Sequence, residues 1–328
     1  MPGRVEGSPP KLVLILSENW TLVSPRDLPA VVALAVAAEE AGFDAVMASE
    51  HVVLGPGADG SGLPVNPRDY ALPGNQDPGM PWPSSLLLLS AVASATTRIR
   101  LVAGAVIPPL RHPLLLAKEL ATLDLLSEGR LVVQPTVSWH RQEYEALGVP
   151  FSERGALLDE HLAVWRLVWR ESPASFEGRH YRFTDVFVEP KPYRPDGPAL
   201  WFGGTELHER LLARLVAYGS GFNPLGRPGP EALERLGAAM AVAGRDMADL
   251  EMVGGTRGAF RGSTDVADLD AALASVPEQV AAGYGTICIK PSQFTDDARA
   301  VPSLCRDIVE RVAELTRPGP LPSDGDGA

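Results

Sequence analysis

Residues 97–169 form the stretch that most restricts what this chain can fold into. Within it, 99–106 is a continuous apolar run of strand length, and another apolar run begins at 131. Apolarity that continues along a strand, instead of alternating, is typical of strands buried on both faces of a parallel sheet. Residues 114–126, between the two runs, carry apolar side chains at helical spacing. The stretch therefore predicts a strand, a crossover helix and a second parallel strand.

The same alternation extends along the whole chain and predicts an α/β fold, a (β/α)8 TIM barrel. The expected strands are 12–16, 44–48, 99–106, 131–133, 199–202, 221–223, 250–253 and 286–289. The helices expected after them are 27–41, 84–95, 114–126, 153–169, 206–218, 231–243, 265–282 and 298–315. A doubly wound open sheet is the alternative, but it usually carries a GxGxxG fingerprint after its first strand. Here that strand is followed by Ser17-Glu18-Asn19-Trp20, so the barrel is favoured.

Two insertions interrupt this repeat. Residues 55–83, after the second strand, are rich in Gly, Pro and Asn, and a predicted β-hairpin turns at Glu177-Gly178 before the fifth strand. A loop as long as 55–83 is usually a lid or a binding loop, with a flexible surface insertion as the plain alternative. Because the loop leaves the carboxyl end of a strand, we expect a lid. We predict one barrel domain over 11–316, between disordered segments at 1–10 and 317–328.

Charge and cysteine content exclude several classes of protein. The 328 residues carry a net charge of −12, which argues against binding to nucleic acid or to an anionic membrane. The cysteines, Cys288 and Cys305, form no CxxC motif, and Cys288 lies in an apolar run where a small buried side chain is expected. No HxH pair occurs, so a metal site is not predicted. The N-terminus has no apolar signal core, which indicates a cytoplasmic protein.

Three runs of the sequence resemble one protein family. They are RHPLLLAKELATLDLLSEGR at 111–130, EYEALGVPFSERGALLDE at 143–160 and FEGRHYRF at 176–183. By these runs and by the order of its elements, the chain is similar to the luciferase-like monooxygenase superfamily, most of all to its coenzyme F420-dependent branch. The resemblance extends over 11–312. It implies a TIM barrel that holds a flavin or deazaflavin at the carboxyl ends of its strands.

The end of the second strand carries the first candidate site residues, Glu50 and His51. Histidine titrates near neutral pH and can act as an acid, a base or a hydrogen-bond donor. From position alone, a structural histidine that bonds the following loop is almost as good an interpretation. In the family that the chain resembles, an acidic residue followed by histidine at this place often lies beside the reactive ring. The resemblance therefore implies that His51 is catalytic and that Glu50 contacts the cofactor.

Two further strand ends provide candidates for cofactor binding. The resemblance places a non-proline cis peptide against the flavin ring after the third strand, and we expect it between Ala105 and Val106. Gly203-Gly204-Thr205 lies between a strand and a helix, where glycines let backbone N–H groups approach a phosphate. An ordinary strand end and a common turn are the respective alternatives. The run WFGG at 201–204 matches the phosphate-binding strand end of the family.

The end of the fourth strand departs from the pattern of many relatives, which carry a glycine-rich GVGxGW-like run there. Here the run is QPTVSW, in which Pro135 lacks a backbone donor. Thr136 and Ser138 can still donate hydrogen bonds to the edge of a cofactor ring. Trp139 is expected to stack on a ring or to form a wall of the substrate pocket, with packing at the strand end as the alternative.

Together these features predict an oxidoreductase that uses reduced coenzyme F420 for hydride transfer with a small organic substrate. An FMN-dependent monooxygenase is the alternative, and a barrel that binds a cofactor or metabolite without catalysis is an alternative of another class. A composition rich in Arg and Ala and poor in Lys is typical of GC-rich genomes and, with the resemblance, favours F420. By analogy with the family we expect a homodimer, and no nucleic-acid or membrane partner.

Overall fold

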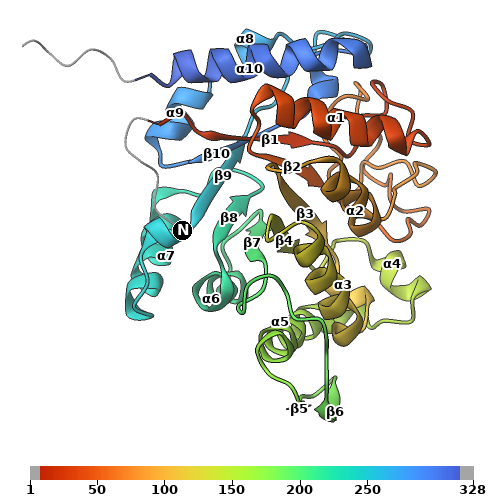
Figure 1. The fold of residues 1–328 in the computed structure, drawn as a ribbon. Coiled ribbons are helices and arrows are strands. Elements are labelled where there is room, and N and C mark those ends of the chain that lie inside the picture. The colour runs from red at the N-terminus through yellow and green to blue at the C-terminus, as the bar shows by residue number, and fades with distance from the viewer. Residues whose placement is uncertain (1–7, 318–328) are drawn as a thin grey trace, which may run out of the picture.

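The computed structural model describes residues 8–317 and contains eight parallel strands closed into a barrel (Figure 1). The barrel strands are β1 (Lys11–Ile15), β2 (Ala45–Ala48), β3 (Arg100–Val106), β4 (Leu131–Pro135), β7 (Ala199–Gly204), β8 (Gly221–Pro224), β9 (Glu251–Gly255) and β10 (Thr286–Ile289). They follow one another around the barrel in chain order, and β1 pairs with both β2 and β10. The predicted TIM barrel is confirmed. Disorder was predicted for 1–10 and 317–328, and of these segments residues 1–7 and 318–328 lie outside the described residues.

Helices cover the outside of the barrel (Figure 1). They are α1 (Leu28–Ala41), α2 (Ser85–Ala95), α3 (Pro113–Leu126), α4 (Arg141–Ala146), α5 (Arg154–Arg170), α6 (Glu209–Tyr218), α7 (Pro230–Val242), α8 (Leu269–Leu273), α9 (Val276–Ala281) and α10 (Val301–Leu315). Local sequence explains their ends, as α1 shows. The Asp27 carboxylate accepts the N–H of Ala30, and the helix stops at Gly42, whose φ of 101° favours glycine.

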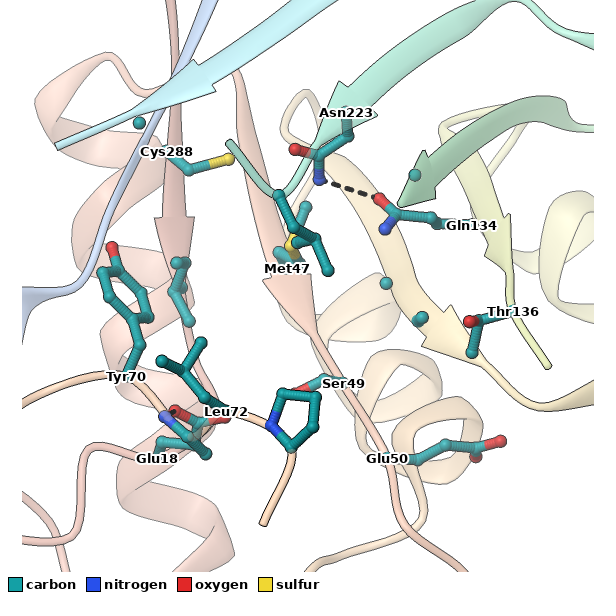
Figure 2. A pocket seen from close by; sticks show the side chains of 18 of the residues that line it. Glu18, Met47, Ser49, Glu50, Tyr70, Leu72, Gln134, Thr136, Asn223 and Cys288 are labelled. Carbon is teal, nitrogen blue, oxygen red and sulfur yellow. Dashed lines mark hydrogen bonds between the residues drawn. The ribbon is translucent and has the colours of Figure 1, made fainter. Parts of the chain in front are cut away.

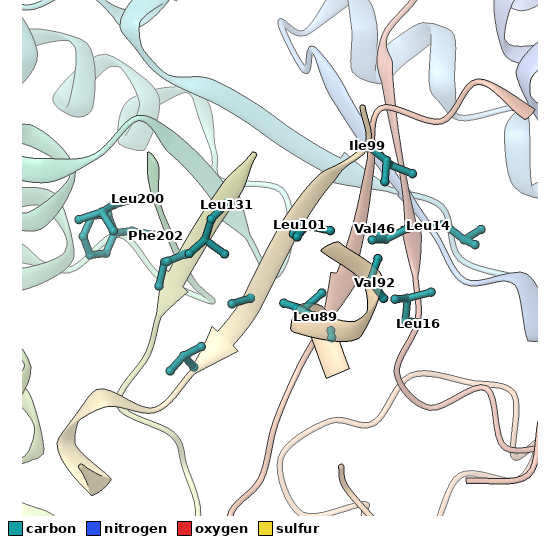
Figure 3. Close-up of a cluster of buried hydrophobic side chains, with 14 of the residues drawn as sticks. Leu14, Leu16, Val46, Leu89, Val92, Ile99, Leu101, Leu131, Leu200 and Phe202 are labelled. Carbon is teal, nitrogen blue, oxygen red and sulfur yellow. The ribbon is translucent and has the colours of Figure 1, made fainter. Parts of the chain in front are cut away.

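Side chains alternate along each barrel strand between two apolar layers. One layer, including Leu14, Val46 and Leu101, packs outward against helices such as α2, which contributes Leu89 and Val92 (Figure 3). The other layer points into the barrel and contains Val13, Ala45, Met47, Val102, Val132, Trp201, Val253 and Cys288. The centre of the barrel is therefore filled, and a ligand must bind at an end of it.

Two helical segments differ from the prediction. Residues 265–282, expected as one helix, contain the short helices α8 and α9, with Pro277 in the first turn of α9. Proline has no N–H to donate and its ring clashes with the preceding turn, so a helix through it would be broken. The second difference is α4, which the prediction did not include because only six residues form it.

The predicted hairpin is confirmed as β5 (Ala174–Glu177) paired antiparallel with β6 (Arg182–Val186). It projects from the barrel below α5 in Figure 1. Among the described residues, no helix is both long enough and apolar enough to cross a membrane.

Candidate functional site

A cavity of about 500 Å³ opens at the carboxyl ends of the barrel strands. All eight barrel strands contribute to its wall, either directly or through the residues that follow them. The loop 55–83 adds Tyr70, Leu72, Gln76 and Trp82. TIM-barrel enzymes carry their active sites at this end, and ligand pockets commonly enclose 300–1,000 Å³.

Most of the predicted site residues meet at this cavity. Its lining includes Glu50, His51, Ala105, Thr136, Ser138, Trp139, Gly203 and Gly204. Val106 and Thr205 are not part of the lining, because Val106 is fully buried and Thr205 is exposed to solvent. The expected position of the cis peptide is wrong by one residue. The cis bond joins Gly104 to Ala105, and both of these residues line the cavity.

His51 is held at the cavity wall by a buried carboxylate that the sequence analysis missed. Its Nδ1 lies 3.4 Å from Oε2 of Glu143, whose side chain has no exposed surface. Among residues 8–317, Nε2 of His51 has no hydrogen-bond partner. The rings of Trp82 and Trp139 contact the imidazole edge-on, with centroids 5.2 and 6.0 Å away. The ring is therefore fixed on one side and can act on a ligand through Nε2.

Glu143 lies in α4 and is ionised by its surroundings. Besides His51, its carboxylate accepts the N–H of Val52 at 2.6 Å and the hydroxyl of Ser138 at 3.1 Å. Burial alone would raise the pKa of Glu143, but its three hydrogen-bond donors outweigh burial and hold that pKa below its ordinary value. An ionised Glu143 keeps the proton of a neutral His51 on Nδ1, so that Nε2 is an acceptor.

Ser138 reaches Glu143 through an unusual turn after β4. Its φ is 56°, a left-handed conformation that residues other than glycine seldom adopt. The turn places the Ser138 hydroxyl on Glu143 and the side chains of Trp139 and Thr136 at the cavity. Residues with such strained backbones are concentrated at functional sites, which supports a role for this turn.

Glu50 serves the structure of the site more than its ligand. Its carboxylate accepts two hydrogen bonds from Arg111, at 2.7 and 2.9 Å, and one from the N–H of Ile107 at 3.0 Å. The hydroxyl of Ser85 adds a fourth at 3.1 Å. Figure 2 shows this carboxylate directed away from the cavity. Glu50 thus ties the end of β2 to the end of β3, and its oxygens have little capacity left for a ligand.

The loop 55–83 crosses the mouth of the barrel and is fixed on both sides. Where it begins, the N–H of Gly55 donates to Nε2 of His140 at 2.7 Å. Burial lowers the pKa of His140, although Glu143 opposes this shift, and a neutral imidazole can accept that bond. These contacts argue against a flexible surface insertion.

On the opposite side of the mouth, Lys290 holds the loop. Its Nζ donates to the backbone oxygen of Asp69 at 2.8 Å and lies 3.3 Å from Oε2 of Glu18. The same Glu18 oxygen accepts the N–H of Ala71 at 2.9 Å. Burial lowers the pKa of Lys290, and Glu18 opposes the shift. Lys290, whose side chain is 1% exposed, is an ion-paired anchor of the loop.

The Cys288 thiol and the His112 imidazole, two further groups that could take part in chemistry, have structural roles instead. The Cys288 thiol is buried in the barrel, and burial together with Glu251 raises its pKa to about 12, so it remains protonated. His112 caps α3 by accepting the N–H of Leu114. Among the described residues, no three His, Cys, Asp or Glu side chains are grouped as metal ligands would be.

Known proteins with related sequences and folds agree with this architecture. An uncharacterised protein of Mycobacterium tuberculosis (strain ATCC 25618 / H37Rv) is 36% identical over 41% of this chain and 46% of its own length. The FMNH2-dependent dimethylsulfone monooxygenase of Pseudomonas putida is 29% identical over 56% of this chain and 46% of its own length. The matches thus span about half the length of these curated relatives.

A solved F420-dependent secondary alcohol dehydrogenase, in complex with an F420–acetone adduct, has the same fold. It superimposes with a TM-score of 0.68 at 16% identity, over 94% of this chain and all of that one. The sequence model of the luciferase-like monooxygenase family matches residues 12–302, which is most of the chain. The protein therefore belongs to the luciferase-like monooxygenase family.

Proposed function

We propose that this protein is an oxidoreductase that uses coenzyme F420 for hydride transfer with a small organic substrate in the cavity. One observation carries the proposal. His51 is held through Nδ1 by the buried Glu143 and presents Nε2, without a protein partner among the described residues, to the cavity. A histidine supported by a carboxylate in this way is equipped to exchange a proton with a bound molecule.

The lining of the cavity fits a planar ring with a polar edge. The backbone at Gly104-Ala105 forms one wall with almost no side chain. Thr136, Gln134 and Asn223 bring hydrogen-bonding groups to the cavity. Gly203 and Gly204 also line it, where the absence of side chains gives a phosphate-bearing tail room to approach the backbone. Both flavin and deazaflavin rings have such a shape.

The residues of this chain then have separate tasks. When bound, the reduced deazaflavin supplies a hydride, and the protein supplies position and proton transfer. His51 Nε2 gives a proton to, or takes one from, the substrate atom whose charge changes. Glu143 keeps the imidazole oriented and stabilises its protonated form. Trp82 and Trp139 shield the imidazole, so that water has less access to the reacting atoms.

An FMN-dependent monooxygenase is the second candidate. The similarity to the dimethylsulfone monooxygenase of Pseudomonas putida, named as FMNH2-dependent, favours it. The cavity described above would accept an FMN ring equally well. A barrel that binds a metabolite without catalysis is less compatible with the arrangement of His51 and Glu143, which a binding site alone does not need.

Binding and turnover measured together test these candidates. Purified protein is titrated with F420 and with FMN by fluorescence quenching, and the preferred cofactor is then used with a panel of alcohols, ketones and thioethers. Tighter binding of F420 supports hydride transfer, and tighter binding of FMN supports the monooxygenase. His51→Ala should retain binding and lose turnover, whereas His112→Asn, an exposed helix cap outside the cavity, should change neither. Failure to bind either cofactor would contradict both candidates.

A further inference from the structure

Two side-chain amides meet on the floor of the cavity. Asn223, in β8, donates from Nδ2 to Oε1 of Gln134, in β4, at 2.9 Å (Figure 2). Each amide thereby uses one of its two polar ends. Among residues 8–317, Gln134 Nε2 and Asn223 Oδ1 have no hydrogen-bond partner, and neither atom is sealed from solvent. The pair therefore presents one unused donor and one unused acceptor beside each other at the cavity.

The surroundings of this pair are largely apolar or lack side chains. Met47 and Cys288 also line the cavity (Figure 2), and Gly104 lies against Met47. Gly203 gives the pair its room. A Cβ at position 203 would lie 3.0 Å from Gln134 Nε2 and 2.5 Å from the backbone oxygen of Asn223. The absence of a side chain at Gly203, near the end of β7, thus leaves space for the pair, besides any contact with a phosphate.

The chemistry of the pair is independent of how its amides are oriented. The oxygen and nitrogen of a side-chain amide are normally assigned from hydrogen bonding. If both amides turned over, Gln134 would donate to Asn223, and the free groups would be an oxygen and an NH2. In either state one donor and one acceptor remain. A ring that carries adjacent C=O and N–H groups satisfies both of them at once.

We propose that Gln134 and Asn223 form a recognition site for the lactam or imide edge of a planar ring. The inference deepens the proposed function, because it rests on the cavity being the place where that ring binds. The ring could come from the cofactor, since flavins and deazaflavins carry a pyrimidinedione, or from a substrate with the same edge. A bound ring that covered the pair without bonding it would leave two buried polar groups unsatisfied, which strongly disfavours such ligands.

The experiment uses ring probes with and without the N–H group. Lumiflavin, an isolated flavin ring, is compared with 3-methyllumiflavin, and uracil with 1,3-dimethyluracil, by calorimetry on the intact protein. If Gln134 and Asn223 hydrogen-bond to a ring, its methylated form should bind the wild-type protein about 10- to 100-fold more weakly than the parent probe. This comparison needs no substitution, so a misfolded variant cannot confuse it.

Substitutions then assign the discrimination to the pair. Gln134→Met and Asn223→Leu keep similar volumes without the amides, and both should remove most of the preference for the parent probe. Glu234→Met, an exposed change in α7 outside the cavity lining, is the control. If the variants lose the preference for lumiflavin over 3-methyllumiflavin, the cofactor ring is the ligand. If they lose the preference for uracil over 1,3-dimethyluracil while the preference for lumiflavin is unaffected, a substrate ring is the ligand.

Two results separate this inference from the proposed function. If F420 and FMN fail to bind but a ring probe is still discriminated through Gln134 and Asn223, the proposed function is wrong and the recognition site stands. If F420 binds the wild type and both variants equally, and neither parent probe is preferred to its methylated form, the recognition site is wrong and the proposed function stands.

Discussion

At the residue scale, the support of His51 by Glu143 leads to the first prediction. Glu143→Gln preserves the shape of the side chain but can no longer stabilise a charged imidazole. We expect kcat to fall about 100-fold with little change in KM, because acid–base catalysis by a histidine contributes that order of rate. The pH profile of kcat should also shift. Glu145→Gln, an exposed change in the same helix, should have no effect, and an equal fall in both variants would contradict the proposed role.

Glu143 also predicts a dependence of stability on pH. Its pKa in the folded protein lies below the ordinary value because of its hydrogen-bond donors. Such a group stabilises the fold above its unfolded pKa of about 4.3, and this stabilisation is lost as pH falls through the folded pKa. We expect the wild type to exceed Glu143→Gln by about 1–3 kcal/mol in unfolding free energy at pH 7. Urea unfolding should show the difference shrinking below about pH 4, and a difference that grows there would contradict the assignment.

The sequence predicted the roles of residues that are marked by their type and position, but not of residues whose roles depend on tertiary contacts. His51 was singled out by its type and its place after a strand, and the resemblance to the family made it the catalytic candidate. Glu143 was not, because a carboxylate in a charged segment resembles a solvated helix face until the fold buries it. Glu50 was assigned to the cofactor, and its ion pair with Arg111 was not predicted. The pairing of Gln134 with Asn223 joins two strands far apart in sequence, which no local pattern reveals.

At the scale of elements, the loop 55–83 depends on Lys290 for its position. Lys290→Met fills a similar volume but removes the donor that joins Asp69 and Glu18. We expect amide hydrogen exchange at 68–72 to become about 10-fold faster or more, since a charged hydrogen bond to the loop is lost. Lys118→Met, on the exposed face of α3, is the control. Unchanged exchange in Lys290→Met would show that other contacts hold the loop.

Elements with strong periodic patterns were the ones that the sequence predicted. The barrel strands are continuous apolar runs because both of their faces are buried, and the observed strands lie within a few residues of those expected. Helical spacing alone did not show that Pro277 interrupts 265–282. The short α4 is held by tertiary contacts such as the bond from Tyr144 to the backbone of Val137, and a six-residue segment gives no periodic signal.

At the scale of the whole molecule, the barrel separates a ligand-binding end from a stabilising end. At the amino ends of the strands, Arg100 of β3 reaches across to Glu251 of β9 with two hydrogen bonds of 2.8 Å. The hydroxyl of Thr286 in β10 and the ammonium of Lys11 in β1 lie 2.5 and 3.6 Å from Oε1 of Glu251. This carboxylate therefore joins four strands at the end opposite the cavity. Burial alone would raise the pKa of Glu251, but its cationic and hydroxyl partners have the larger effect and hold that pKa below its ordinary value. Glu251 is therefore charged at neutral pH.

The separation of the two ends predicts that stability and ligand binding respond to different carboxylates. Glu251→Gln should lower the unfolding free energy by about 3 kcal/mol, because it leaves Arg100 without its charged partner in a mostly buried site. The dissociation constant of the bound cofactor should remain unchanged, and the exposed change Glu231→Gln should alter neither quantity.

Since residues at opposite ends of the barrel share no partner, Glu143→Gln and Glu251→Gln should be additive in unfolding free energy within about 0.5 kcal/mol. Weaker cofactor binding in Glu251→Gln, or strong non-additivity, would mean that the two ends of the barrel are coupled.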